Sequence, residues 1–73
     1  MKMFVTTIIR EHSDSETDVH HTEQEALAWC AKALFLVEEG RMNEGDPPPS
    51  FEQMRKIAGD YGWEITLDER HLA

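Results

Sequence analysis

The sequence has a single cysteine, few basic residues and no long apolar run. One thiol cannot form a disulfide within the chain, which excludes a secreted disulfide scaffold and fits a cytoplasmic location. The most apolar stretch near the start, "MKMFVTTIIREH", is short, rich in β-branched residues and interrupted by two threonines. It has the character of neither a signal peptide nor a membrane span, so we expect no membrane interaction.

The length of 73 residues indicates one domain, residues 1–73. A domain of this size buries only about 60% of the surface that its unfolded chain exposes, so its core is thin and leaves no room for a deep cleft. The sequence also contains no glycine-rich phosphate loop, nucleophile elbow or paired-carboxylate motif. We therefore expect a protein that is not an enzyme and needs no cofactor.

Acidic residues dominate the charge. Fifteen acids against seven bases give a formal net charge of −8, and six of the acids lie between Glu11 and Glu25, where there is no lysine or arginine. A field of this sign repels nucleic acids and anionic membranes and attracts basic protein surfaces or cations. Direct binding of DNA or RNA is the partnership that the charge disfavours most.

The first third of the chain predicts a β-hairpin. Residues 3–9, "MFVTTII", have apolar side chains on both faces, as a central strand would. The cluster "HSDSE" supplies turn residues, and residues 17–21, "TDVHH", are long enough for a returning strand. With Asp14 and Ser15 at the tip of the turn, the strands pair in a defined register: Glu11 opposite Asp18, Ile9 opposite His20, and Arg10 facing Val19.

A helix is expected over residues 23–39. Thr22 and Glu25 have the spacing of a capping box, and Gly40 is a suitable left-handed terminator. Cys30 falls on the apolar face and reads as a small core residue rather than a nucleophile. At 100° per residue, that face contains Ala26, Leu27, Cys30, Ala33, Leu34 and Val37.

Large apolar residues continue on both sides of that face: Trp29 and Leu36 on one side and Phe35 on the other. One sheet cannot cover so wide an apolar surface. A second helix is the simpler cover, and a surface for homodimerisation or for a partner, built from Trp29, Phe35 and Leu36, is the alternative.

The rest of the chain predicts a linker, a helix and a strand. Residues 40–49 contain three consecutive prolines and two glycines. Ser50 and Gln53 then form a second capping-box pattern, and the apolar residues that follow repeat at helical spacing up to Gly62. Residues 63–69, "WEITLDE", alternate as a half-buried strand does, and the tail "RHLA" is expected to fray.

Together these elements predict an α+β fold in the order β-β-α-α-β. A small two- or three-stranded sheet would be packed on one face by two helices.

Two sets of residues have a spacing that metal ligands could use. Asp14, Glu16, Asp18 and Glu25 match the carboxylate positions of an EF-hand calcium loop, but Val19 stands where that loop needs glycine and no helix precedes it. A second set, Glu11, Asp18 and His20, lacks the close histidine or cysteine spacing typical of zinc sites. Strand alternation also separates His20 from His21. We therefore expect no metal site.

A row of carboxylates can reproduce the charge of a nucleic-acid backbone, so a groove that binds phosphate can accept it. The alternative is that the negative charge serves only solubility. The candidate residues for contact with a basic partner are Glu11, Asp14, Glu16, Asp18, Glu23 and Glu25.

The short chain, the opening strand, the apolar helix beginning in "TEQEALAWCAKAL" and the acidic surplus resemble the small anti-CRISPR proteins that phages and mobile elements encode. These proteins share no signature motif, so the resemblance transfers no residue roles. It implies an inhibitor that mimics DNA and blocks the nucleic-acid-binding surface of a bacterial surveillance complex in the host cytoplasm. The second hypothesis is an accessory or antitoxin-like module that forms a homodimer through its apolar helix face.

Overall fold

In the computed structural model, residues 1–11 and 14–71 are described, and they form three strands and two helices. In chain order these are β1 (Lys2–Ile9), β2 (Ser15–His20), α1 (Glu23–Ala33), α2 (Phe51–Asp60) and β3 (Glu64–His71). This order and the α+β class confirm the fold predicted from the sequence.

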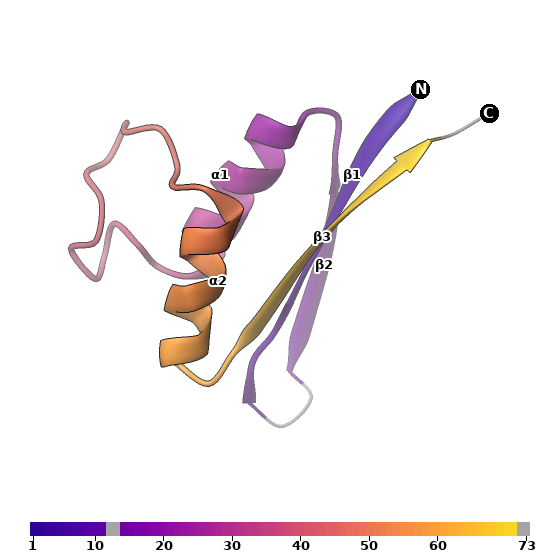
Figure 1. Ribbon diagram of the computed structural model, residues 1–73. Coiled ribbons are helices and arrows are strands. Elements are labelled where there is room, and N and C mark those ends of the chain that lie inside the picture. The colour runs from indigo at the N-terminus through magenta and orange to yellow at the C-terminus, as the bar shows by residue number, and fades with distance from the viewer. Residues whose placement is uncertain (12–13, 72–73) are drawn as a thin grey trace.

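The three strands form one antiparallel sheet in the order β2-β1-β3. The apolar character of both faces of β1 is explained by its central place. Phe4, Thr6 and Ile8 alternate with less buried neighbours and lie against the helices. Both helices pack on this one face, as Figure 1 shows, and the opposite face of the sheet has no covering element among the described residues.

The core lies between the sheet and the two helices. Ile8 and Ile65 are opposite each other on β1 and β3 and provide its floor. Met54 and Ala58 enter it from α2, as the helical spacing after Ser50 predicted. The remaining buried members come from α1 and the segment that follows it: Cys30, Ala31, Leu34 and Leu36.

The predicted hairpin register is wrong. Ser15 is the first residue of β2 and pairs with Ile9, while His20 pairs with Phe4. The connection spans residues 10–14, and the Arg10 amide donates to the Asp14 carbonyl at 2.7 Å. Because the two registers differ by an odd number of residues, His20 moves from the open face to the helix-covered face. There its burial beside Thr6 and Trp29 favours the observed pairing.

Helix α1 ends at Ala33, six residues before the predicted end. Phe35 has a left-handed backbone, with φ 58°, and its amide donates to the Lys32 carbonyl at 3.0 Å. The Leu36 amide donates to the Ala31 carbonyl at 3.2 Å, so the two bonds form a Schellman motif with phenylalanine in the usual place of glycine. This reversal buries Leu36, which is 1% exposed, against the core.

Glycines close the next two turns. Gly40, at φ 73°, donates to the Val37 carbonyl and ends a separate turn after α1, so it is left-handed as predicted but does not end the helix itself. Gly62, at φ 78°, closes α2 in the same way, and the Trp63 amide donates to the Ala58 carbonyl at 2.8 Å. This turn at Gly62 leads directly into β3, which begins at Glu64.

The prediction of a frayed tail is wrong for Arg70 and His71. Both belong to β3, where Arg70 pairs with Met3 and His71 with Lys2. Ladder hydrogen bonds and the ion pair between Lys2 Nζ and Glu69 Oε1, at 3.0 Å, hold this end of the strand. The last two residues of the predicted tail lie outside the described residues.

Candidate functional site

Two of the six candidate acids lie on β2, the outer strand at one edge of the sheet. Glu16 and Asp18 are opposite Ile8 and Thr6, so both project on the side of the helices. They are nevertheless exposed, because β2 lies at the outer edge of the sheet. Alternate residues of a strand are about 6–7 Å apart, so the Cα atoms of these two residues have about this separation.

Arg10 neutralises the hairpin end of this edge. Its Nη1 is 3.9 Å from Asp14 Oδ2, and its Nη2 is 3.5 Å from Glu16 Oε2. The same Nη2 donates to the Ala33 carbonyl at 3.3 Å, and the guanidinium lies 5.4 Å from the centre of the Trp63 ring. Arg10 thus satisfies a free carbonyl at the end of α1, where a positive charge is favourable, and binds two candidate carboxylates as well.

The sequence does not predict this role of Arg10. The predicted register places Arg10 opposite Val19, whereas in the structure its guanidinium reaches the end of α1. The available signal was that Arg10 is the one base close in sequence to the acidic segment.

The other end of the edge has no such neutralisation. Asp18, Glu23 and Glu25 are all exposed, and within the described part of the chain none of them forms an ion pair. Glu23 and Glu25 lie in the first turn of α1, where the positive end of the helix dipole stabilises their negative charge. Thr22 caps that turn, since its Oγ1 accepts from the Glu25 amide at 3.1 Å.

The six predicted acids therefore fall into two groups along the chain. Glu11, Asp14 and Glu16 lie towards the hairpin, and Asp18 to Glu25 lie towards the start of α1; Figure 1 shows β2 running between the two ends. We call the second group, Asp18, Glu23 and Glu25, the acidic end.

The two histidines occupy separate environments, as strand alternation predicted. His20 is 9% exposed, its Nε2 is 3.0 Å from Thr6 Oγ1, and its ring centre is 5.9 Å from that of Trp29. His21 is exposed in the bend that follows β2. His20 thus packs at the edge of the core, in contact with Thr6 and Trp29.

Neither proposed metal set is assembled. Glu11 lies in the hairpin connection and is not opposite Asp18, and the supposed calcium loop contains the extended strand β2. In residues 1–11 and 14–71 no group of three histidine, cysteine or acidic side chains is arranged to hold a metal ion.

Cys30 lies in the core, where burial raises the pKa of its thiol from 9.0 to about 11. The charged thiolate is unfavourable in this apolar surrounding because it would lose its hydration. Such an environment is the opposite of the one that activates a nucleophilic cysteine.

The alternative dimer surface is only partly available. Leu36 is buried, Trp29 is half-buried against the core, and Phe35 is 46% exposed. Val37, which the sequence placed on the core face, is 40% exposed because the chain reverses before it. Trp29 and Phe35 form walls of a shallow hollow that Arg10, Glu16, Lys32 and Ala33 complete.

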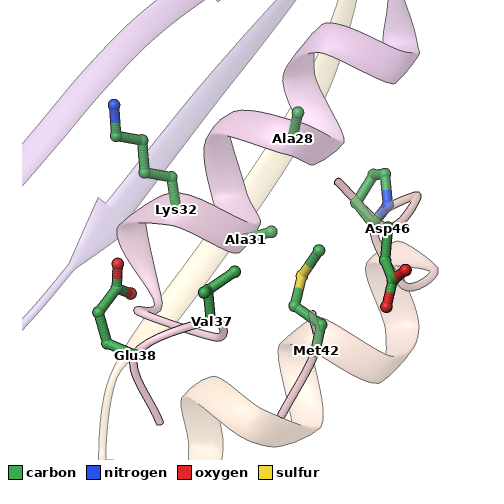
Figure 2. Close-up of a pocket in the computed structure, with 8 residues that line it drawn as sticks. Ala28, Ala31, Lys32, Val37, Glu38, Met42 and Asp46 are labelled. Carbon is green, nitrogen blue, oxygen red and sulfur yellow. The ribbon is translucent and has the colours of Figure 1, made fainter. Parts of the chain in front are cut away.

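A small cavity of about 150 Å³ lies between α1 and the connection to α2. Figure 2 shows Ala31, Val37 and Met42 around it, with Lys32 and Glu38 on one side and Asp46 on the other. Small-molecule sites usually occupy about 300–1,000 Å³. The cavity is smaller than this, and the charged residues in its lining are Lys32, Glu38 and Asp46.

Comparison with known proteins gives no relative: the chain matches no protein-family model, no curated protein and no solved structure. None of the helices in the described residues is long and apolar enough to cross a membrane. A functional assignment therefore depends on the surfaces themselves.

Proposed function

We propose that this protein binds a basic protein surface through its acidic end and the adjoining edge of β2, acting as an inhibitor that takes the place of DNA. The observation that carries the proposal is the exposure of Asp18, Glu23 and Glu25 without a paired cation in the described part of the chain. A lysine- and arginine-rich groove would provide the missing counter-charges.

The partner that this chemistry favours is a nucleic-acid-binding complex of the bacterial cytoplasm, with a CRISPR surveillance complex as the specific hypothesis. Electrostatic attraction speeds the encounter with such a surface. The protein itself would not bind nucleic acid, because its net charge is −8.

A co-purification experiment tests this proposal. Tagged protein is incubated with bacterial lysate, bound proteins are identified, and duplex DNA is added as a competitor. We expect capture of a nucleic-acid-binding complex that DNA displaces and that added salt releases, because exposed charge pairs are screened. A captured complex that DNA does not displace contradicts mimicry.

Two charge-matched variants make the test specific for the acidic end. The first is Asp18→Asn with Glu23→Gln and Glu25→Gln, and the control is Glu44→Gln with Glu52→Gln and Asp60→Asn, which removes the same charge from other exposed positions. Losing three exposed pairs should weaken capture by about tenfold or more. Equal weakening in the two variants would show that only net charge matters.

The second candidate function is homodimerisation through the apolar helix side. The exposure of Phe35 and Val37 favours it. Because Leu36 belongs to the core, Phe35→Ala is the informative variant: it should dissociate such a dimer in a sedimentation measurement without unfolding the protein. A dimer unchanged by Phe35→Ala excludes this surface.

A further inference from the structure

The face of the sheet that points away from the helices carries no charge on two of its three strands. On β1 it presents Met3, Val5, Thr7 and Ile9, and directly opposite on β2 it presents Ser15, Thr17 and Val19. Charged residues make up 30% of the chain, so an uncharged surface of this extent is a distinct feature. Every charge that the strands place on this face belongs to β3: Glu64, Asp68 and Arg70.

This surface is poorly suited to face water. Val19 is 50% exposed and Ile9 is 39% exposed, although both are large apolar residues. The Oγ1 atoms of Thr7 and Thr17 are 3.2 Å apart and hydrogen-bond each other, which reduces their need for water. An antiparallel sheet can leave a polar face in water, whereas exposed apolar residues on such a face favour association, and a second sheet is a common cover.

The charges on β3 indicate which partner could cover the open face of the sheet. Glu64 is opposite Ile9 and Arg70 is opposite Met3, so opposite charges stand near the two ends of the strand. A twofold axis that lies above the open face, parallel to the sheet, and crosses the strands at the level of Thr6 places β3 antiparallel over β3 of a second copy. Each Arg70 then faces Glu64 of the other copy, and the valines on this face of β1 and β2 face the threonines of the same strands.

We propose that a second copy of this chain covers the open face of the sheet and forms a twofold dimer with two Arg70–Glu64 ion pairs. The acidic end lies outside this face, because Asp18 projects on the side of the helices and Glu23 and Glu25 lie in α1. The dimer is therefore independent of the proposed inhibitory function.

The size of the face predicts a weak dimer. Three strands of up to eight residues cover on the order of 400 Å² on each copy, about half of the usual contribution to a stable interface. A charge of −8 on each copy also opposes association. Raising salt from about 20 to about 150 mM screens this repulsion and should strengthen the dimer, whereas it should weaken a complex made by the acidic end.

Sedimentation equilibrium from about 5 to about 500 µM tests the dimer, with association expected towards the upper concentrations. Arg70→Glu should weaken it by about tenfold, since two attractions become repulsions, and Glu64→Arg should do the same. Combining Arg70→Glu with Glu64→Arg restores both pairs and should recover the wild-type association. Arg55→Glu and Glu44→Arg are the controls for the same charge changes at exposed positions outside this face.

Three results overturn the proposal. One is a monomer over the whole concentration range at about 150 mM salt. The second is a dimer whose association the combined reversal does not restore, and the third is a dimer that Phe35→Ala dissociates. Far-UV circular dichroism of each variant shows that it is folded, so a change in association cannot be attributed to unfolding.

Discussion

Arg10 links four parts of the molecule through one guanidinium. It contacts two acids of the β2 edge, the last carbonyl of α1 and the ring of Trp63. Only 16% of its side chain is exposed, so these interactions are screened less than those of a typical surface arginine. A single residue thereby sets how much of the acidic edge is available to a partner.

Replacing Arg10 should change stability and binding in opposite directions. Arg10→Met retains an apolar stem over Trp63 but removes the charge, so the free energy of unfolding should fall by about 1 kcal/mol in urea denaturation. Binding of a poly-lysine peptide, measured by calorimetry, should strengthen because Asp14 and Glu16 lose their internal partner. Lys56→Met makes the same charge change on α2. Equal strengthening in both variants would show that Arg10 has no specific effect.

The raised pKa of the Cys30 thiol should make the free energy of unfolding decrease at alkaline pH. The folded thiol keeps its proton up to about pH 11, whereas the unfolded thiol releases it near the usual pKa of 9.0. The folded state therefore binds more protons between these values, and the free energy of unfolding should decrease by on the order of 2 kcal/mol as pH rises from 9 to 11. Below pH 9.0 this contribution is fully present.

The comparison with Cys30→Ala isolates the contribution of the thiol, because all other side chains are common to both proteins. The variant should be less stable at neutral pH, since it leaves a small void. Its unfolding free energy should decline less between pH 9 and 11, and parallel curves would argue against the role of the thiol.

Phe35 occupies a backbone conformation that favours glycine. At φ 58° its side chain costs about 1–2 kcal/mol relative to an unstrained position. Phe35→Gly should therefore be more stable than Phe35→Ala by about 1 kcal/mol, the reverse of the order found inside a helix. Thermal unfolding of the two variants measures this difference. Greater stability of the alanine variant would mean that residue 35 continues the helix.

At the scale of the elements, the start of α2 depends on a complete capping box. Ser50 Oγ accepts from the Gln53 amide at 3.2 Å, and Gln53 Oε1 accepts from the Ser50 amide at 3.2 Å. Ser50→Ala should cost about 1 kcal/mol in urea denaturation, while Ser50→Asp, which keeps an acceptor at a favourable position for negative charge, should cost only a few tenths. Equal losses would contradict this account.

The two helices differ in how far the sequence predicted them. Both starts follow from contacts within four residues, Thr22 with Glu25 and Ser50 with Gln53, and both are confirmed. The end of α1 depends on the burial of Leu36 against residues distant in the chain, and no local pattern contains that information. The apolar run from Ala33 to Val37 is compatible with a longer helix. The helix ends at Ala33 because the reversal that follows it buries Leu36 in the core.

At the scale of the whole molecule, the net charge of −8 should make stability depend on salt. Raising sodium chloride from about 10 to about 200 mM screens the mutual repulsion, and we expect the melting temperature to rise by a few degrees. Scanning calorimetry measures this, and the variant with Asp18, Glu23 and Glu25 neutralised should show a smaller rise. A falling melting temperature would mean that attractive pairs, such as Lys2 with Glu69, dominate.

The distribution of charge also gives the molecule two different surfaces. The acidic end carries exposed carboxylates, whereas the open sheet face is uncharged on β1 and β2 and carries charge only on β3. The sequence predicted the first surface by its run of acids. It did not identify the second, because the wrong register put His20 on the open face together with Ile9.

The sequence by itself determined the order of the elements, the starts of both helices, the place of the core residues on α2 and the acidic character of one segment. These properties depend on neighbours within a few positions or on composition. The tertiary structure decided the pairing of β2, the end of α1, the neutralisation of Asp14 and Glu16 by Arg10, and the face of the sheet that stays uncovered. Each of these depends on which distant side chains the core buries together, so the folded chain alone could reveal them.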